Sequence, residues 1–102
     1  MTDIAKARRE AVRWLILVTL NAARPVGANE LIVIDCVRQG QPDVTERELR
    51  LEMDYLMERG LVELTCRDCD TWFGKLTRSG IDVVEYTVEC DPGINRPRKY
   101  WK

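Results

Sequence analysis

The chain has 102 residues, a formal net charge of −1 and 45% hydrophobic residues, which is enough for one compact domain with a single core. Its longest apolar stretch, residues 14–18, is far shorter than the roughly 20 residues of a membrane-spanning helix, and the N-terminus lacks a signal-peptide cleavage site. We therefore expect a cytoplasmic protein that does not bind membranes. Histidine is absent, and the sequence contains no phosphate-binding loop, nucleophile–base pair or zinc-hydrolase motif, so we predict no enzymatic activity, metal or cofactor.

Two helices are expected in the first forty residues. The first spans Asp3 to Ala23, where strong helix formers run without Gly or Pro. Apolar residues recur there at helical spacing, namely Ala7, Ala11, Trp14, Leu15 and Val18. Residues 24–27 break this helix, and a second helix is predicted over Glu30 to Gln39, capped by Asn29 and closed by Gly40. Its inward-facing side chains are predicted to be Leu31, Ile32, Ile34, Cys36 and Val37.

The third helix has the clearest signals at its two ends. Thr45 and Glu48 form a Thr-x-x-Glu capping box, and Gly60 stands where a left-handed C-terminal cap falls. One apolar face is formed by Leu49, Met53 and Leu56. These signals predict a helix over Thr45 to Arg59.

After Gly60 the apolar period changes from 3.6 to 2, which predicts a two-stranded hairpin over residues 62–76 with Asp68-Cys69-Asp70 at its tip. Thr77 is expected to cap a last short helix that runs to about Tyr86, with Leu76 and Ile81 packed across the cap. A turn at residues 91–93 follows, and the chain ends on Arg, Lys, Tyr and Trp. We expect residues 1–90 to form the domain and residues 91–102 a basic and aromatic tail.

The order helix, helix, helix, hairpin, helix resembles the winged helix-turn-helix superfamily. Residues 56–63 are similar to its Leu-x-x-x-Gly-Leu-Val-Glu segment, and residues 76–80, Leu-Thr-Arg-Ser-Gly, are similar to the Leu-Thr-x-x-Gly that follows the wing. The size also resembles small winged-helix proteins of Mu-like phages and prophages. The resemblance covers roughly residues 11–86 and implies an α+β, mainly helical fold with a three-helix core, a two-stranded wing and a C-terminal helix. Winged helices bind DNA, RNA and proteins, so the resemblance does not decide the partner.

The four cysteines are too few for a disulfide scaffold, and we expect free thiols. Cys66 and Cys69 form a Cys-x-x-Cys pair in the hairpin, and Cys90 follows. Two alternatives stay open: a zinc site, which would need Cys36 as its fourth ligand, and a reversible redox pair.

Charge is unevenly distributed along the chain. Residues 1–24 carry a net charge of +3 and residues 96–102 carry +4, whereas residues 25–95 hold seven bases and fifteen acids. The predicted third helix has five acids and three arginines. Because nonspecific DNA affinity comes mainly from cations that displace phosphate counterions, an acidic centre weakens the simplest DNA-binding interpretation.

The first functional hypothesis is a small DNA-binding transcriptional regulator of phage or bacterial type. Arg47 and Arg50 would reach the major groove from the start of the third helix, and Lys75 would contact DNA from the wing. The tail residues predicted to grip phosphate are Arg96, Arg98, Lys99 and Lys102. Tyr100 and Trp101 either stack on bases or fold back over the core. We also expect a homodimer, since winged-helix regulators commonly pair through their first and last helices, and a dimer would present two third helices to a palindromic site.

The alternative hypothesis is a protein-interaction module that uses the acidic face of the third helix. Leu51 and Tyr55 lie one turn apart and away from the apolar stripe. With Glu52 and Asp54 they would form a mixed apolar and acidic patch for a basic partner. Packing of Leu51 and Tyr55 against the first helix or a second subunit is the competing interpretation.

Overall fold

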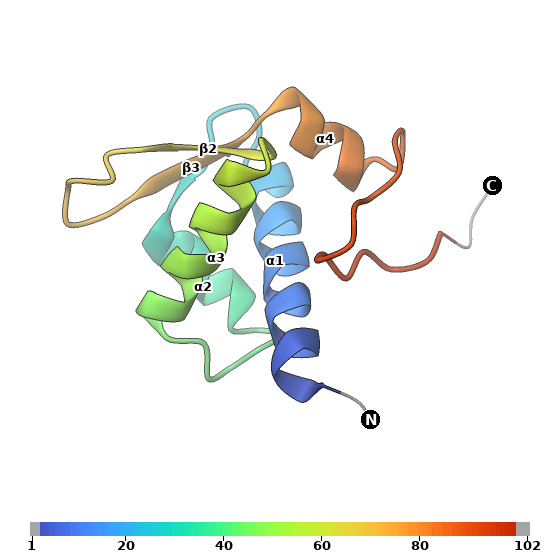
Figure 1. Cartoon of the computed structure of the whole chain (residues 1–102). Helices are drawn as coiled ribbons and strands as arrows, with labels where there is room; N and C mark the ends of the chain where they lie inside the picture. Colours follow the sequence, from blue (N-terminus) through green and yellow to red (C-terminus); the bar gives the residue numbers. More distant parts are fainter. Residues whose placement is uncertain (1–2, 100–102) are drawn as a thin grey trace.

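The computed structural model describes residues 3–99 and places one long helix at the centre of the molecule (Figure 1). The elements follow in the order α1 (Ile4–Ala22), β1 (Ala28–Asn29), α2 (Glu30–Val37), α3 (Glu46–Glu58), β2 (Val62–Thr65), β3 (Phe73–Leu76) and α4 (Arg78–Val84). Helices α2 and α3 lie along one side of α1, the β2–β3 hairpin projects outward from the end of α3, and α4 lies near the C-terminal end of α1. Residues 3–99 thus form an α+β fold of four helices and one three-stranded antiparallel sheet.

The sheet contains one strand more than the sequence predicted. Strands β2 and β3 pair antiparallel from Val62 opposite Leu76 to Thr65 opposite Phe73, which confirms the hairpin. Strand β1 adds to the other edge of β3, with Ala28 opposite Gly74. The prediction of a two-stranded sheet is therefore corrected, because two residues carry no periodic signal and β1 exists only through its pairing with β3.

The core is built around α1, which packs against α2, α3, α4 and β3. Its fully buried side chains are Val12, Ile16, Leu17 and Leu20. From α3 the apolar stripe Leu49, Met53 and Leu56 is completely buried, as predicted. Val18 of α1 remains 40% exposed. The packing of the other elements therefore leaves part of the α1 surface open to solvent.

Side-chain caps set the start of every helix. Asp3, Asn29, Thr45 and Thr77 each accept a hydrogen bond from the backbone N–H three residues further on. The predicted third helix is confirmed with Thr45 as its N-cap and Arg59 as its C-cap. Gly60 adopts φ +77°, the left-handed conformation that lets the chain leave α3 and enter β2 directly.

The prediction for the second helix is partly wrong. Helix α2 ends at Val37 rather than Gln39, and α4 likewise ends at Val84, earlier than the expected Tyr86. In α2, Val33, Ile34 and Val37 are buried, whereas the predicted inward residues Leu31, Ile32 and Cys36 are exposed. Six of the eight residues of α2 are apolar and the other two are acids, so the spacing of apolar residues could not define one buried face.

Cys66 and Cys69 form a disulfide, with their Cα atoms 5.0 Å apart. The expectation of free thiols is wrong for this pair and holds for Cys36 and Cys90. The reason is local: Cys69 N donates to Cys66 O at 3.0 Å, and this turn at the hairpin tip brings the two side chains together. The bonded sulfurs are not available as zinc ligands, and no cluster of three or more potential metal-ligating side chains occurs within residues 3–99.

The segment after the turn at residues 91–93 passes beside α1 and then runs outward from the body of the molecule (Figure 1). Asn95 N donates to the carbonyl of Glu10 in α1 at 3.1 Å, and Tyr86 Oη donates to the carbonyl of Pro97 at 2.7 Å. Cys90 and Ile94 pack against the hydrophobic core. Across residues 3–99, no helix has both the length and the apolar character that a membrane crossing requires.

Candidate binding surface on helix α3 and the β2–β3 hairpin

A groove of about 480 Å³ lies between the outer face of α3 and the tip of the β2–β3 hairpin. Its lining residues are Glu46, Arg47, Arg50, Leu51, Asp54 and Asp70. The groove therefore brings together residues that the sequence assigned to both functional hypotheses, two arginines for DNA and two residues for a protein partner. We call it the α3–hairpin groove.

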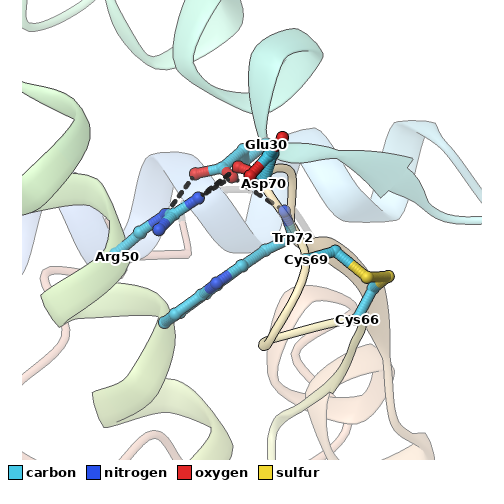
Figure 2. The surroundings of a disulfide bond; sticks show 6 residues. All are labelled: Glu30, Arg50, Cys66, Cys69, Asp70 and Trp72. Atoms are coloured by element: carbon cyan, nitrogen blue, oxygen red, sulfur yellow. Dashed lines mark hydrogen bonds and ion pairs between the residues drawn. A yellow bond between two sulfur atoms is a disulfide. The ribbon is translucent and has the colours of Figure 1, made fainter.

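Arg50, on α3, is hydrogen-bonded to both α2 and the hairpin (Figure 2). Its Nε donates to Glu30 Oε2 at 2.7 Å and its Nη2 donates to Glu30 Oε1. The same Nη2 donates to the carbonyl oxygen of Asp70 at 2.7 Å, and Cζ lies 4.7 Å from the centroid of the Trp72 ring. A guanidinium held this way fixes the hairpin tip to the start of α2 and is not free to read a base edge.

Glu30 is the partner that sequence reasoning missed. It is only 5% exposed, and besides Arg50 it accepts a hydrogen bond from Trp72 N at 2.7 Å while its own N–H donates to the Trp72 carbonyl at 2.9 Å. The hydrogen bonds from Arg50 hold the pKa of Glu30 below its ordinary value. In the sequence Glu30 is an ordinary acid in the first turn of a helix, so nothing local revealed this role.

The acidic patch proposed for a protein partner is largely internal. Glu52 is 5% exposed and pairs with Arg13 of α1, so its assignment as a partner-contacting residue is corrected. Tyr55 is half-buried, with Arg13 Cζ 3.5 Å above its ring, and Asp54 is paired with Arg67 of the hairpin. Leu51 alone fits the original proposal, since it is 59% exposed.

Helix α3 buries a wider face than the sequence indicated, and this explains the change for Glu52. The predicted stripe used positions 49, 53 and 56, but position 52 lies on the same side of the helix one turn after position 49. Because α1 packs against α3, Glu52 faces Arg13 rather than solvent. An acid on that side of α3 is stable only with a buried cation opposite it.

The remaining residues predicted to bind DNA differ in their exposure and in the bonds that they form within the protein. Arg47 and Lys75 are exposed and form no ion pair or hydrogen bond from their side chains within residues 3–99. Arg96 donates to the carbonyls of Val83 and Val88, and its guanidinium lies over the Tyr86 ring. Arg98 and Lys99 are exposed. Lys102 lies outside the described residues, as do Tyr100 and Trp101.

A second open surface lies between α1 and α2. It is a groove of about 640 Å³ whose lining is almost entirely apolar or small, with Leu15, Val18, Ala22, Ile32 and Cys36 among its residues. No Asp, Glu, Lys or Arg contributes to it. No segment among residues 3–99 covers this groove, and its chemistry differs sharply from that of the α3–hairpin groove.

No protein-family model matches this chain, and searches of curated proteins and of solved structures give no significant similarity. A functional assignment therefore depends on the residues and geometry of this chain alone.

Proposed function

We propose that this chain is a winged-helix module that binds another protein through the α3–hairpin groove. The fold supports a winged helix because the glycine-terminated α3 leads directly into an antiparallel hairpin, and α4 follows that hairpin after the Thr77 cap. The observation that carries the protein-binding proposal is the commitment of Arg50 to Glu30, which removes one of the two cations from the groove.

The charges left in the groove favour a basic ligand. Asp54 and Arg50 are already in ion pairs, so the exposed charged residues of the groove that form no ion pair within residues 3–99 are Glu46, Asp70 and Arg47. Two carboxylates outnumber one guanidinium, and Asp68, two residues before Asp70 in the hairpin, is also exposed. A phosphate backbone would be repelled here, whereas a lysine or arginine would be attracted.

Leu51 supplies the apolar contact that such a ligand needs. It is 59% exposed and is the one apolar residue among the six that line the groove. An apolar centre with a charged rim is the arrangement found in protein interfaces. The ligand we propose is a protein segment that offers one apolar side chain next to one or two cations.

A displayed library of random 12-residue peptides tests this proposal. We expect the wild-type protein to enrich peptides that combine Arg or Lys with an apolar residue, and we expect binding of an enriched peptide to fall at least tenfold in Leu51→Lys and in the double variant Glu46→Lys, Asp70→Lys. Glu63→Lys, on an exposed position of β2, is the matched charge control. Enrichment of peptides that bind all four proteins equally would contradict the proposal.

DNA binding is the second candidate, and one observation favours it: Arg47 and Lys75 are exposed cations without an intramolecular partner in the described chain. If they contact phosphate, binding of a random 30-base-pair duplex pool will weaken steeply as the salt concentration rises. In the double variant Arg47→Ala, Lys75→Ala, the slope of log K against log salt concentration should become shallower by about two units, one for each phosphate contact that is lost. Absence of binding to the pool at low salt would eliminate this candidate.

Homodimerisation is a further part of the proposal. The apolar groove between α1 and α2 gives α1 a face that a second copy could bury, as expected for pairing through the first helix. Sedimentation analysis distinguishes a species of 11.8 kDa from one of twice that mass. A Val18→Glu variant should be monomeric if this face is the interface, because a buried unpaired carboxylate is strongly unfavourable.

A further inference from the structure

The tip of the β2–β3 hairpin combines an exposed disulfide with the contacts that close the α3–hairpin groove (Figure 2). Residues 66–69 form the tip, both cysteines are exposed, and Asp70 and Trp72 follow immediately. The carbonyl oxygen of Asp70 accepts a hydrogen bond from Arg50, and the N–H of Trp72 donates one to Glu30. The covalent bond and the polar anchor of the hairpin are therefore separated by only one to three residues.

We propose that Cys66 and Cys69 form a thiol–disulfide exchange site for low-molecular-weight thiols, and that the oxidised state holds the hairpin tip against α3 and α2. This proposal goes beyond the protein-binding function and does not require it, because it concerns the state of the hairpin in the free protein.

Exposure makes the exchange chemically accessible. A small thiolate attacks one sulfur of the pair, which forms a mixed disulfide and releases the other cysteine as a thiolate. A second small thiolate attacks the small-molecule sulfur of the mixed disulfide and releases the remaining cysteine. In total, two small thiols are oxidised to one small disulfide, the protein disulfide gains two electrons, and the two protons end on Cys66 and Cys69.

The backbone at Cys66 gives the oxidised state a structural consequence. Cys66 has φ +59°, in the left-handed region that is unfavourable for a residue with a Cβ. The disulfide and the hydrogen bond from Cys69 N to Cys66 O hold this conformation. Once the sulfurs separate, the covalent restraint on this conformation is lost, and the hydrogen bond across the turn and the Arg67–Asp54 pair remain to oppose a return of Cys66 to an ordinary conformation.

Relaxation of Cys66 displaces the residues on which the groove depends. Arg67, the next residue, pairs with Asp54 of α3, and its guanidinium carbon lies 5.2 Å from the centroid of the Trp72 ring. On the other side of Cys69, Asp70 holds Arg50. Loosening of residues 66–70 therefore weakens both attachments of the hairpin to α3 and leaves Asp54 and part of Arg50 open to solvent.

The chain offers a direct assay for the bond. Trypsin cleavage after Arg67 separates residues 60–67, which contain Cys66, from residues 68–75, which contain Cys69. The two peptides stay linked only in the oxidised protein. In mixtures of reduced and oxidised glutathione, we expect the linked pair to disappear as the reduced form increases and to return when oxidised glutathione is restored. A linked pair that never forms, or one that a hundredfold excess of reduced glutathione leaves unchanged, would overturn the exchange site.

Amide hydrogen exchange tests the structural consequence. We expect exchange at the Trp72 amide to be at least tenfold faster in the reduced protein and in each of the single variants Cys66→Ser and Cys69→Ser. The Leu56 amide in α3 should keep its rate in all samples, which shows that the fold is intact. Cys36→Ser, which replaces an exposed cysteine in α2, is the matched control and should behave as wild type. Equal Trp72 exchange in the oxidised and reduced proteins would overturn the proposed control of the hairpin, whether or not a peptide ligand is ever found.

Discussion

Arg13 Nε of α1 donates to Glu52 Oε1 of α3 across 2.7 Å, and the two side chains are 12% and 6% exposed. The same guanidinium donates from Nη1 to the carbonyl of Gly93 at 2.8 Å and lies over the Tyr55 ring. One arginine therefore joins the central helix, the third helix and the segment that follows α4.

Replacement of Arg13 by Ala should destabilise the protein strongly. The variant leaves the buried carboxylate of Glu52 without its cation, which in proteins costs about 3–5 kcal/mol of the free energy of unfolding. Urea denaturation monitored by circular dichroism measures the loss. Arg9→Ala removes an exposed arginine from the same helix and should change stability by less than about 0.5 kcal/mol. A loss for Arg13→Ala as small as that of the control would show that the pair contributes little.

Acid should destabilise the protein as the pH falls below 4.5, the ordinary pKa of a glutamate. Hydrogen bonds from Arg50 lower the pKa of Glu30, and those from Arg8 lower the pKa of Glu48. A carboxylate with a depressed pKa in the folded state stabilises it fully above the unfolded pKa and loses that contribution as the pH falls through the folded pKa.

The variant Glu30→Gln isolates the first of these two groups. It should be less stable than wild type at neutral pH, because Arg50 loses its counter-ion, and its stability should fall less steeply below pH 4.5. Urea midpoints across the acid range measure both effects. Glu63→Gln on β2 is the control for loss of an exposed carboxylate. Identical pH dependence in Glu30→Gln and wild type would contradict the assignment.

Gly80 in α4 should not tolerate a larger residue. A Cβ at this position would collide with the carbonyl oxygen of Leu61, at the junction between α3 and β2, and would press on the Leu76 side chain. Gly80→Ala should therefore cost about 1–3 kcal/mol, as overpacking usually does. The adjacent exposed residue provides the control Ser79→Ala. Thermal unfolding of the two variants compares them, and equal midpoints would show that the helix shifts without cost.

The two free cysteines should differ in reactivity. Burial raises the pKa of the Cys90 thiol, whereas Cys36 is exposed in α2. Since the thiolate is the nucleophile, iodoacetamide at neutral pH should label Cys36 faster than Cys90 by at least several-fold. Peptide mass spectrometry follows the two sites in the same sample. Unfolding in urea should bring the two rates together, and a difference that survives unfolding would have to come from the local sequence.

Local sequence determined the parts of this fold that depend on neighbouring residues. Thr45, Glu48 and Gly60 fixed the ends of α3, because capping hydrogen bonds and a positive φ are interactions within a few residues. The change of period after Gly60 likewise predicted the β2–β3 hairpin, since alternate side chains must face the core.

Tertiary structure alone decided which side chains are available for binding. In the sequence, Arg50 and Glu52 are both charged residues of an amphipathic helix. In the structure, Arg50 links the hairpin to Glu30 of α2, whereas Glu52 is buried against Arg13. Their partners lie 20 and 39 residues away. Strand β1 and the buried side of the almost uniformly apolar α2 were missed for a related reason, because pairing and packing decide them rather than local periodicity. The Cys66–Cys69 bond was missed although its cause is local, because the turn that brings the two cysteines together has no periodic signal. A sequence shows which residues carry charge. Only the packing of distant segments decides whether a charged side chain is paired inside the protein or remains available to a binding partner.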